Sequence, residues 1–121
     1  MRTRVGWYVA VLGLLSLGAA GSTELSSSQK EGVCKLALSK ANANAPSEYR
    51  LTGKAADTLT FASAKGHSYS CEVFNLVIKL SSAGWGRIQP TGNVILEKGC
   101  AKLSLYDPGL MMTHSGEYCG K

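Results

Sequence analysis

The residues with the most distinctive chemistry are four cysteines and two histidines in a chain of 121 residues. They are spaced so that each histidine precedes a cysteine by four or five positions: His67 before Cys71, and His114 before Cys119. Imidazole nitrogen and thiolate sulfur are the ligands of structural zinc sites, so two such pairs could together hold a metal ion. Oxidised cysteines cannot act as thiolate ligands, and the choice therefore depends on the compartment.

The first 20 residues have the pattern of an export signal. Arg2 and Arg4 form a positive segment, Val5 to Leu17 is apolar, and Gly18-Ala19-Ala20 offers the small residues of a cleavage site. The apolar run is shorter than the roughly 20 residues that span a bilayer, which favours cleavage over a retained anchor. We expect an exported protein, periplasmic or extracellular, with residues 1–20 removed and no stable membrane insertion afterwards.

Export favours disulfide bonds over a metal site, because an even number of cysteines in a short exported chain typically forms disulfides. A turn at 107–109 would bring Cys100 near Cys119, and Cys71 lies on the apolar face of a strand on which a helix bearing Cys34 should pack. This favours the pairs Cys34–Cys71 and Cys100–Cys119. The pairs Cys34–Cys100 and Cys71–Cys119 remain an alternative, and we expect no metal and no cofactor.

No catalytic motif stands out. The segment Gly66-His67-Ser68-Tyr69-Ser70 lacks the second glycine of a nucleophile elbow. The sequence singles out no pair of carboxylates among Asp57, Glu72, Glu97, Asp107 and Glu117 for glycoside hydrolysis. No phosphate-binding loop or dinucleotide fingerprint is present. A small secreted hydrolase or toxin with an unrecognised site is therefore an alternative rather than the leading hypothesis.

The charge pattern argues against nucleic acid as a partner. Removal of the leader takes away Arg2 and Arg4 and lowers the formal net charge from +5 to +3. The remaining lysines and arginines never form a run, as expected of an ordinary solvated surface. Binding of an anionic glycan or lipid head group is a further alternative, and it requires these cations to gather on one face of the fold.

The mature chain begins with a serine-rich segment and one helix. Ser28-Gln29-Lys30-Glu31 matches a capping box, and apolar residues at helical spacing follow it up to Ala41. Pro46 cannot continue the helix, so we predict a helix over about 29–43. Residues 21–46 thus form the N-terminal part, and residues 47–121 a β region of the same single domain.

The β region shows alternating apolar residues between turn signals. Its longest strand is predicted over 68–80, with a bulge near Asn75 where the alternation changes phase. The spacing favours a three-residue turn at Ala64-Lys65-Gly66, which sets Phe61 opposite Tyr69. Further turns are predicted at Gln89-Pro90-Thr91-Gly92, Lys98-Gly99 and Asp107-Pro108-Gly109. We expect an α+β fold in which the helix packs on a twisted antiparallel sheet of five or six strands, with a small β-barrel as the alternative.

Five residues near turns form the candidate binding surface: Trp85, Arg87, Tyr106, Met111 and Met112. Tyr, Trp, Arg and Met are the residue types that recur in protein interfaces. The loops 81–84 and 107–110 are where we expect a partner to bind. The leading hypothesis is a non-enzymatic exported protein that binds another protein, as an inhibitor, an immunity protein or a surface accessory factor, in an oligomeric state that the sequence does not define.

Tyr69-Ser70-Cys71 on an early strand, with a last cysteine at Cys119, resembles the periplasmic inhibitors of C-type lysozyme, which are small β-barrels closed by a disulfide. The resemblance implies a barrel and a lysozyme partner. The Ser-Gly-x-x-Tyr loop of such inhibitors is absent as such, since Ser115-Gly116-Glu117-Tyr118 is one residue short. A positive net charge also slows encounter with a cationic lysozyme, so the resemblance serves as an analogy.

Overall fold

The computed structural model describes residues 24–120, so the predicted export signal lies outside the described residues. The elements follow one another along the chain as α1 (Ser27–Asn42), η3 (Pro46–Glu48), β2 (Tyr49–Ala55), β3 (Thr58–Ser63), β4 (Ser68–Phe74), β5 (Val77–Ser81), η4 (Ala83–Trp85), β6 (Thr91–Glu97), β7 (Cys100–Asp107) and β8 (Met112–Tyr118). Within these residues no helix has the length and apolar character needed to cross a membrane.

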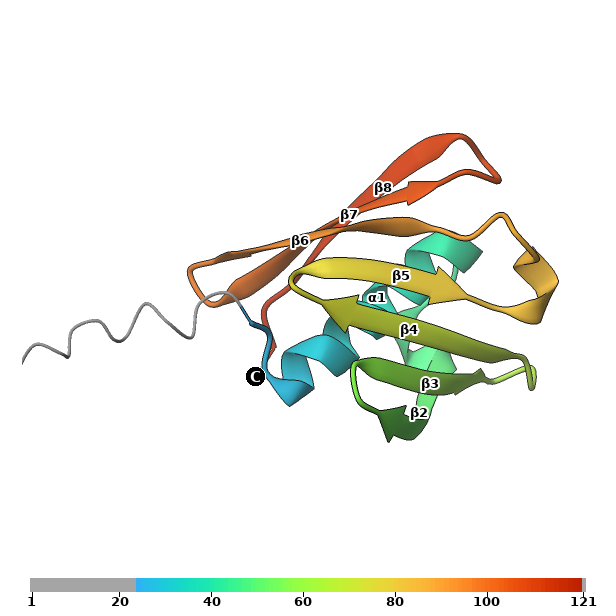
Figure 1. Cartoon of the computed structure of the whole chain (residues 1–121), viewed down its shortest axis with the longest axis horizontal. Coiled ribbons are helices and arrows are strands. Elements are labelled where there is room, and N and C mark those ends of the chain that lie inside the picture. Colours follow the sequence, from blue (N-terminus) through green and yellow to red (C-terminus); the bar gives the residue numbers. More distant parts are fainter. Residues whose placement is uncertain (1–23, 121) are drawn as a thin grey trace, which may run out of the picture.

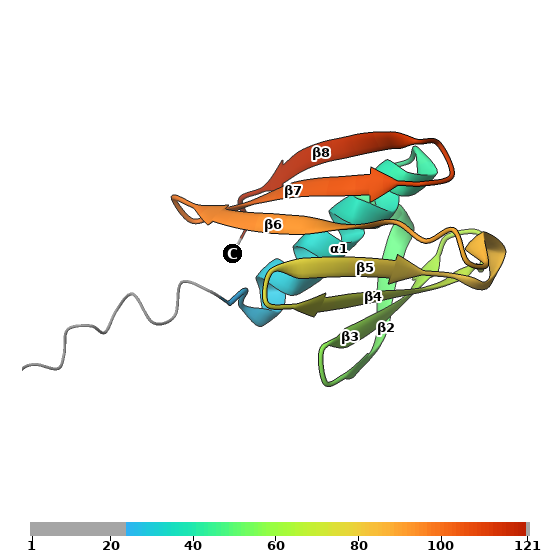
Figure 2. The ribbon, with the colours of Figure 1, turned by 45° about the horizontal axis from the view of Figure 1, so that its top comes forward.

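The fold is one helix packed on a seven-stranded antiparallel sheet. Each strand pairs with the next one along the chain, from β2 at one edge to β8 at the other. Figures 1 and 2 show the twisted sheet curving around α1, which lies against one face. The prediction of an α+β fold is confirmed. The barrel alternative is wrong, because β2 and β8 are both edge strands and do not pair with each other.

The N-cap of the helix lies two residues before the predicted one. Ser26 is the N-cap: its hydroxyl accepts from the Gln29 amide, and the Gln29 side chain accepts from the Ser26 amide. In a capping box, glutamine can accept from the N-cap amide as well as glutamate can. Each of Ser26 and Ser28 is followed three positions later by one of these residues, so the sequence is compatible with either serine as the N-cap. At the other end Ala43 takes a left-handed conformation with φ 57°, which ends the helix before Pro46.

The register of the first hairpins follows the predicted turn. Phe61 pairs with Tyr69 and Leu59 with Cys71, so the three-residue turn at 64–66 is confirmed. These side chains face α1. The core they enter also contains the buried helix residues Val33, Ala37 and Leu38.

The segment 68–80 is two strands and not one bulged strand. Asn75 and Leu76 have φ of 51° and 62°, and together they form a tight turn that pairs Val73 with Ile78. This turn accounts for the change of phase in the apolar pattern. It also adds the strand that raises the count above the predicted five or six.

The predicted turn at 89–92 is wrong. Residues 82–90 form a loop that contains η4, and β6 begins at Thr91, where it pairs with Lys79 of β5. Pro90 supplies no amide, and its carbonyl accepts from the Leu80 amide, so it ends the loop rather than reversing the chain. The strand that precedes β6 in the sheet is therefore β5, and not a segment that ends at the predicted turn.

The last two hairpins lead to the second disulfide. The turn at Lys98-Gly99 is confirmed, since Leu96 pairs with Ala101. Between β7 and β8 the turn covers residues 108–111 and pairs Asp107 with Met112. This turn is longer than expected, so Ala101 pairs with Tyr118 and Cys119 comes next to Cys100.

Two disulfides join the fold in the favoured arrangement. Cys34 of α1 is bonded to Cys71 of β4, and Cys100 is bonded to Cys119 after β8. Cys34 and Cys71 are completely buried, whereas Cys119 is exposed. The first bond therefore fixes the helix to the middle of the sheet, and the second holds the last strand in place.

Candidate functional site

Four of the eight exposed large hydrophobic side chains among residues 24–120 lie at one end of the sheet. They come from the loop between β5 and β6 and from the turn between β7 and β8, which lie at the same end of the molecule on the right of both ribbon views (Figures 1 and 2). Ile88 is 53% exposed, Leu110 61%, Met111 80% and Met112 47%. With Arg87, which is also exposed, these residues are called the end patch below.

The two segments that form the end patch touch each other. A Cβ atom placed on Gly109 would lie 3.5 Å from Cγ2 of Ile88, so Ile88 packs against the β7–β8 turn. The loop containing η4 therefore supports the turn from the side. Ile88 and Gly109 are therefore the point at which the loop and the turn meet, and the exposed residues 110–112 follow directly after it.

A polar pair beneath the turn fixes its shape. Oδ1 of Asp107 accepts hydrogen bonds from the amides of Gly109 and Leu110, and Oδ2 lies 3.1 Å from Nε2 of His114. The two side chains are 10% and 11% exposed. Asp107 is thus the acceptor for the turn, and His114 holds the carboxylate in position from β8.

The backbone of Met111 is in an unusual conformation. Its φ is 54°, in the left-handed region that glycine and asparagine adopt most readily. Burial does not favour a methionine here, because its side chain is 80% exposed. The left-handed backbone does not favour one either. Sites where local preferences are violated in this way are frequently functional.

Three of the predicted surface residues belong to the two segments of the end patch: Arg87, Met111 and Met112. Tyr106 does not join them. It is 46% exposed on the sheet face that α1 leaves open, where it pairs with Thr91 and Thr113. There it borders a shallow depression with a volume of about 410 Å³ that also includes Val77 and Asn93.

Trp85 points toward the core. Its ring lies 5.4 Å from the ring of Tyr69, which in turn packs edge-on against Tyr49 at 5.6 Å. Burial and the neighbouring Tyr49 raise the pKa of the Tyr69 phenol. Trp85 therefore closes one end of the core and anchors the loop that carries Arg87 and Ile88.

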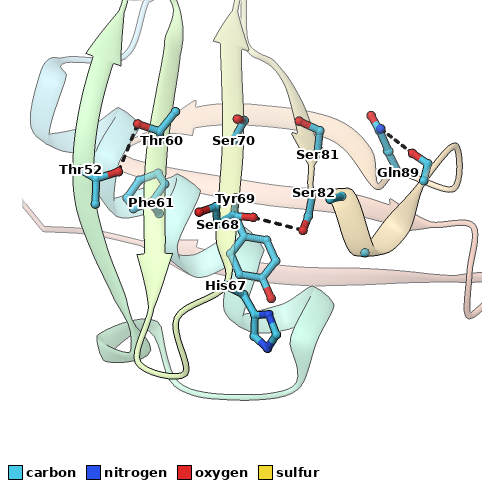
Figure 3. Close-up of a pocket in the computed structure, with 13 residues that line it drawn as sticks. Thr52, Thr60, Phe61, His67, Ser68, Tyr69, Ser70, Ser81, Ser82 and Gln89 are labelled. Carbon is cyan, nitrogen blue, oxygen red and sulfur yellow. Dashed lines mark hydrogen bonds between the residues drawn. The ribbon is translucent and has the colours of Figure 1, made fainter.

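His67 lies in the largest groove found among the described residues, on the open face of the sheet (Figure 3). The groove has a volume of about 660 Å³ and is lined by hydroxyl groups, including those of Thr60, Ser70 and Ser81, which stand in a row across β3, β4 and β5. None of its lining residues carries a carboxylate. In a histidine-activated serine site a third group usually orients the imidazole, and this lining offers no carboxylate for that role.

The cysteines are not available to bind a metal through thiolates. All four are in disulfides, and the two histidines lie on different parts of the sheet. Cys100, Cys119 and Glu117 bring potential ligand atoms within 4.8 Å of one another, but both sulfur atoms of that group belong to one disulfide. The arrangement provides a single carboxylate, which is too little for a metal site.

Three of the lysines are paired with carboxylates. Lys30 pairs with Asp57, Lys35 with Glu31 and Lys102 with Glu97. The three lysines lie on α1 and on β7. These three cations are thus already neutralised and give no support to an anionic glycan or head group as the ligand.

Comparisons with protein families, curated proteins and solved structures find no match for this chain. The functional inference therefore comes from the side chains of the end patch. Sequence reasoning missed Ile88, and it named Leu110 only as part of the loop 107–110. A signal was present, because each is a large apolar residue within a loop rich in glycine and proline, where burial is not expected.

Proposed function

We propose that this protein is an exported, non-enzymatic binding protein whose protein partner docks on the end patch. The observation that carries the proposal is that Ile88 meets the turn at Gly109, next to the exposed Leu110 and Met111. Four large exposed apolar side chains and an arginine on two segments that meet in this way have the composition of a protein interface. Such exposure costs solubility, and it is retained where a partner covers it.

The contacts that hold the two segments of the end patch favour a rigid, preformed binding surface. Asp107 holds the turn through two amides, and Trp85 anchors the neighbouring loop in the core. A rigid patch loses little conformational entropy when a partner binds. The Cys100–Cys119 bond further restrains the strand that follows the turn. Export, which depends on the predicted signal at residues 1–20, accounts for the oxidised cysteines.

A photo-crosslinking experiment tests this function. A photoreactive phenylalanine analogue replaces Met111 in one version of the exported protein and Ile95 in another, since both residues are highly exposed but Ile95 lies on β6, outside the end patch. We expect a specific crosslinked protein from the Met111 position and none from the Ile95 position. Equal crosslinking at both positions, or at neither, would contradict the proposal.

A further inference from the structure

The two edges of the sheet differ in how they are protected. β2 has an irregularity in its register between Leu51 and Gly53 and carries Arg50 and Lys54. Bulges and basic residues are the usual means by which edge strands avoid pairing with other chains. β8 pairs with β7 without interruption from Met112 to Tyr118, and it contains no lysine, arginine or proline. The β8 edge therefore lacks the protection that the β2 edge has.

The outer side of β8 is open for pairing. In residues 24–120 its only neighbouring strand is β7, and no backbone hydrogen bond from a turn or loop reaches residues 112–118. The disulfide at one end of β8 and the turn held by Asp107 at the other keep this edge extended. An extended, fixed edge presents a row of amide and carbonyl groups ready for another strand.

A groove lies where the side chains of an added strand would pack. It has a volume of about 520 Å³ between α1 and the end of β8, and its apolar floor includes Gly32, Leu36 and Tyr118. Of the charged residues that line it, Lys35 and Glu31 form an ion pair at 3.1 Å, which leaves Glu117 as the remaining charge. Such a floor suits apolar side chains that alternate along an extended segment.

The helix limits what can occupy this edge. A Cβ atom on Gly116 would come 3.1 Å from both Leu36 and Lys40, so α1 lies directly over the inner face of β8. A second copy that paired its own β8 here would add its own α1 to the same face of the joined sheet, beside the first α1. A single extended segment has no such layer, and the geometry therefore favours it over a second copy.

The outer face of the edge carries unbalanced negative charge. Lys102 faces Glu117 across the β7–β8 pair, but its ammonium is already bound to Glu97. This contact lowers the pKa of Glu97 and raises that of Lys102. Two carboxylates thus share one cation, so a basic residue opposite Glu117 would complement this face.

From these observations we propose that β8 is a strand-addition site for one extended segment of another polypeptide. That segment has apolar side chains at alternate positions facing α1 and a basic side chain opposite Glu117. It adds an eighth strand through backbone hydrogen bonds, and the side chains set the register. The site begins at Met112, where the end patch stops, and uses the backbone of β8 rather than the side chains of the turn.

The test uses a synthetic peptide in which valine and threonine alternate, with one lysine near the centre of the threonine face. Amide hydrogen exchange of the full mature protein is followed by NMR with millimolar peptide. We expect every second amide from Met112 to Tyr118 to exchange at least about tenfold more slowly. The same peptide with N-methylated central residues should give no protection. No slowing in β8, or slowing at β2 instead, would overturn the proposal.

Charge variants distinguish binding of the peptide in the proposed register from nonspecific adsorption of the peptide. Glu117→Gln should weaken binding of the lysine peptide by about threefold or more, and leave a glutamine version of the peptide unaffected. Glu72→Gln, on the same face but on the interior strand β4, is the matched control and should change neither. An equal effect of the two variants would overturn the assigned register.

Two further outcomes have a defined meaning. Alternate β8 amides that are protected in the free protein, and lose protection on dilution, would show a second copy at the edge and overturn the assigned occupant. Serine substitutions at Leu110 and Met111 should leave peptide protection of β8 intact. This result would hold whether or not the end patch binds its own partner, so the two proposals can fail independently.

Discussion

Nε2 of His114 lies 3.1 Å from Oδ2 of Asp107, and the other oxygen of that carboxylate holds the amides of Gly109 and Leu110. The pair thus connects β8 to the turn that presents the end patch. Both side chains are nearly buried, so the loss of either would leave polar groups without partners.

Asp107→Ala should lower the free energy of unfolding by about 1–3 kcal/mol, because it leaves two turn amides and the His114 ring without their hydrogen-bond partner. Asp57→Ala is the matched control: its carboxylate is 43% exposed and only 3.8 Å from Lys30, so its removal should cost less than about 1 kcal/mol. Urea unfolding monitored by circular dichroism measures both. Equal losses would show that Asp107 does not hold the turn.

The position of the helix cap can be tested with two neighbouring serines. Ser26→Ala should cost about 0.5–2 kcal/mol, because it removes the acceptor for the Gln29 amide. Ser28→Ala removes the cap that the sequence pattern suggested, and it should change stability by less than about 0.5 kcal/mol. Thermal unfolding distinguishes them, and the reverse order of the two losses would place the helix start at residue 28.

The two disulfides should differ in their response to reductant. Cys119 is exposed, whereas Cys34 and Cys71 have no exposed surface, so a thiolate reaches the Cys100–Cys119 bond first. Mass spectrometry after brief alkylation should show Cys100 and Cys119 labelled while the protein stays folded. Labelling of Cys34 or Cys71 at the same stage would contradict the described burial.

Met111 offers a test of the trade between stability and binding. Met111→Gly relieves the left-handed backbone and should stabilise the fold by about 1 kcal/mol, since glycine adopts φ near 54° without cost. The same change should weaken binding of the partner, because it deletes an 80% exposed side chain from the end patch. A gain in stability with undiminished binding would mean that Met111 is exposed for another reason.

Much of the architecture could be predicted because local signals agreed with the packing. The alternation of apolar residues around Cys71 and their spacing from Phe61 predicted the register of β3 and β4. The apolar stripe of the helix predicted that Cys34 packs over Cys71. The turn at Asn75-Leu76 could not be recognised. Leucine in a left-handed conformation gives no turn signal, and the residues on both sides are apolar, so the two strands resembled one.

The candidate site was harder to predict than the fold. The residue types of Met111 and Met112 could be noticed in the sequence. The contact between their turn, at Gly109, and Ile88 of the loop 82–90 depends on how the sheet twists. Trp85 was assigned to the surface from its glycine neighbours, whereas Tyr69 draws its ring inward. Whether an aromatic residue beside a turn faces solvent depends on side chains that are distant in the sequence, and one sequence does not show which of them will lie nearby.

The most direct test of the central claim compares two substitutions at equally exposed positions. Leu110 and Ile95 are both 61% exposed, but only Leu110 belongs to the end patch. With the crosslinked partner in hand, titration calorimetry measures the affinity of Leu110→Ser and Ile95→Ser. We predict that Leu110→Ser weakens binding by about tenfold or more and Ile95→Ser by less than about twofold. Equal affinities for the two variants would contradict the account.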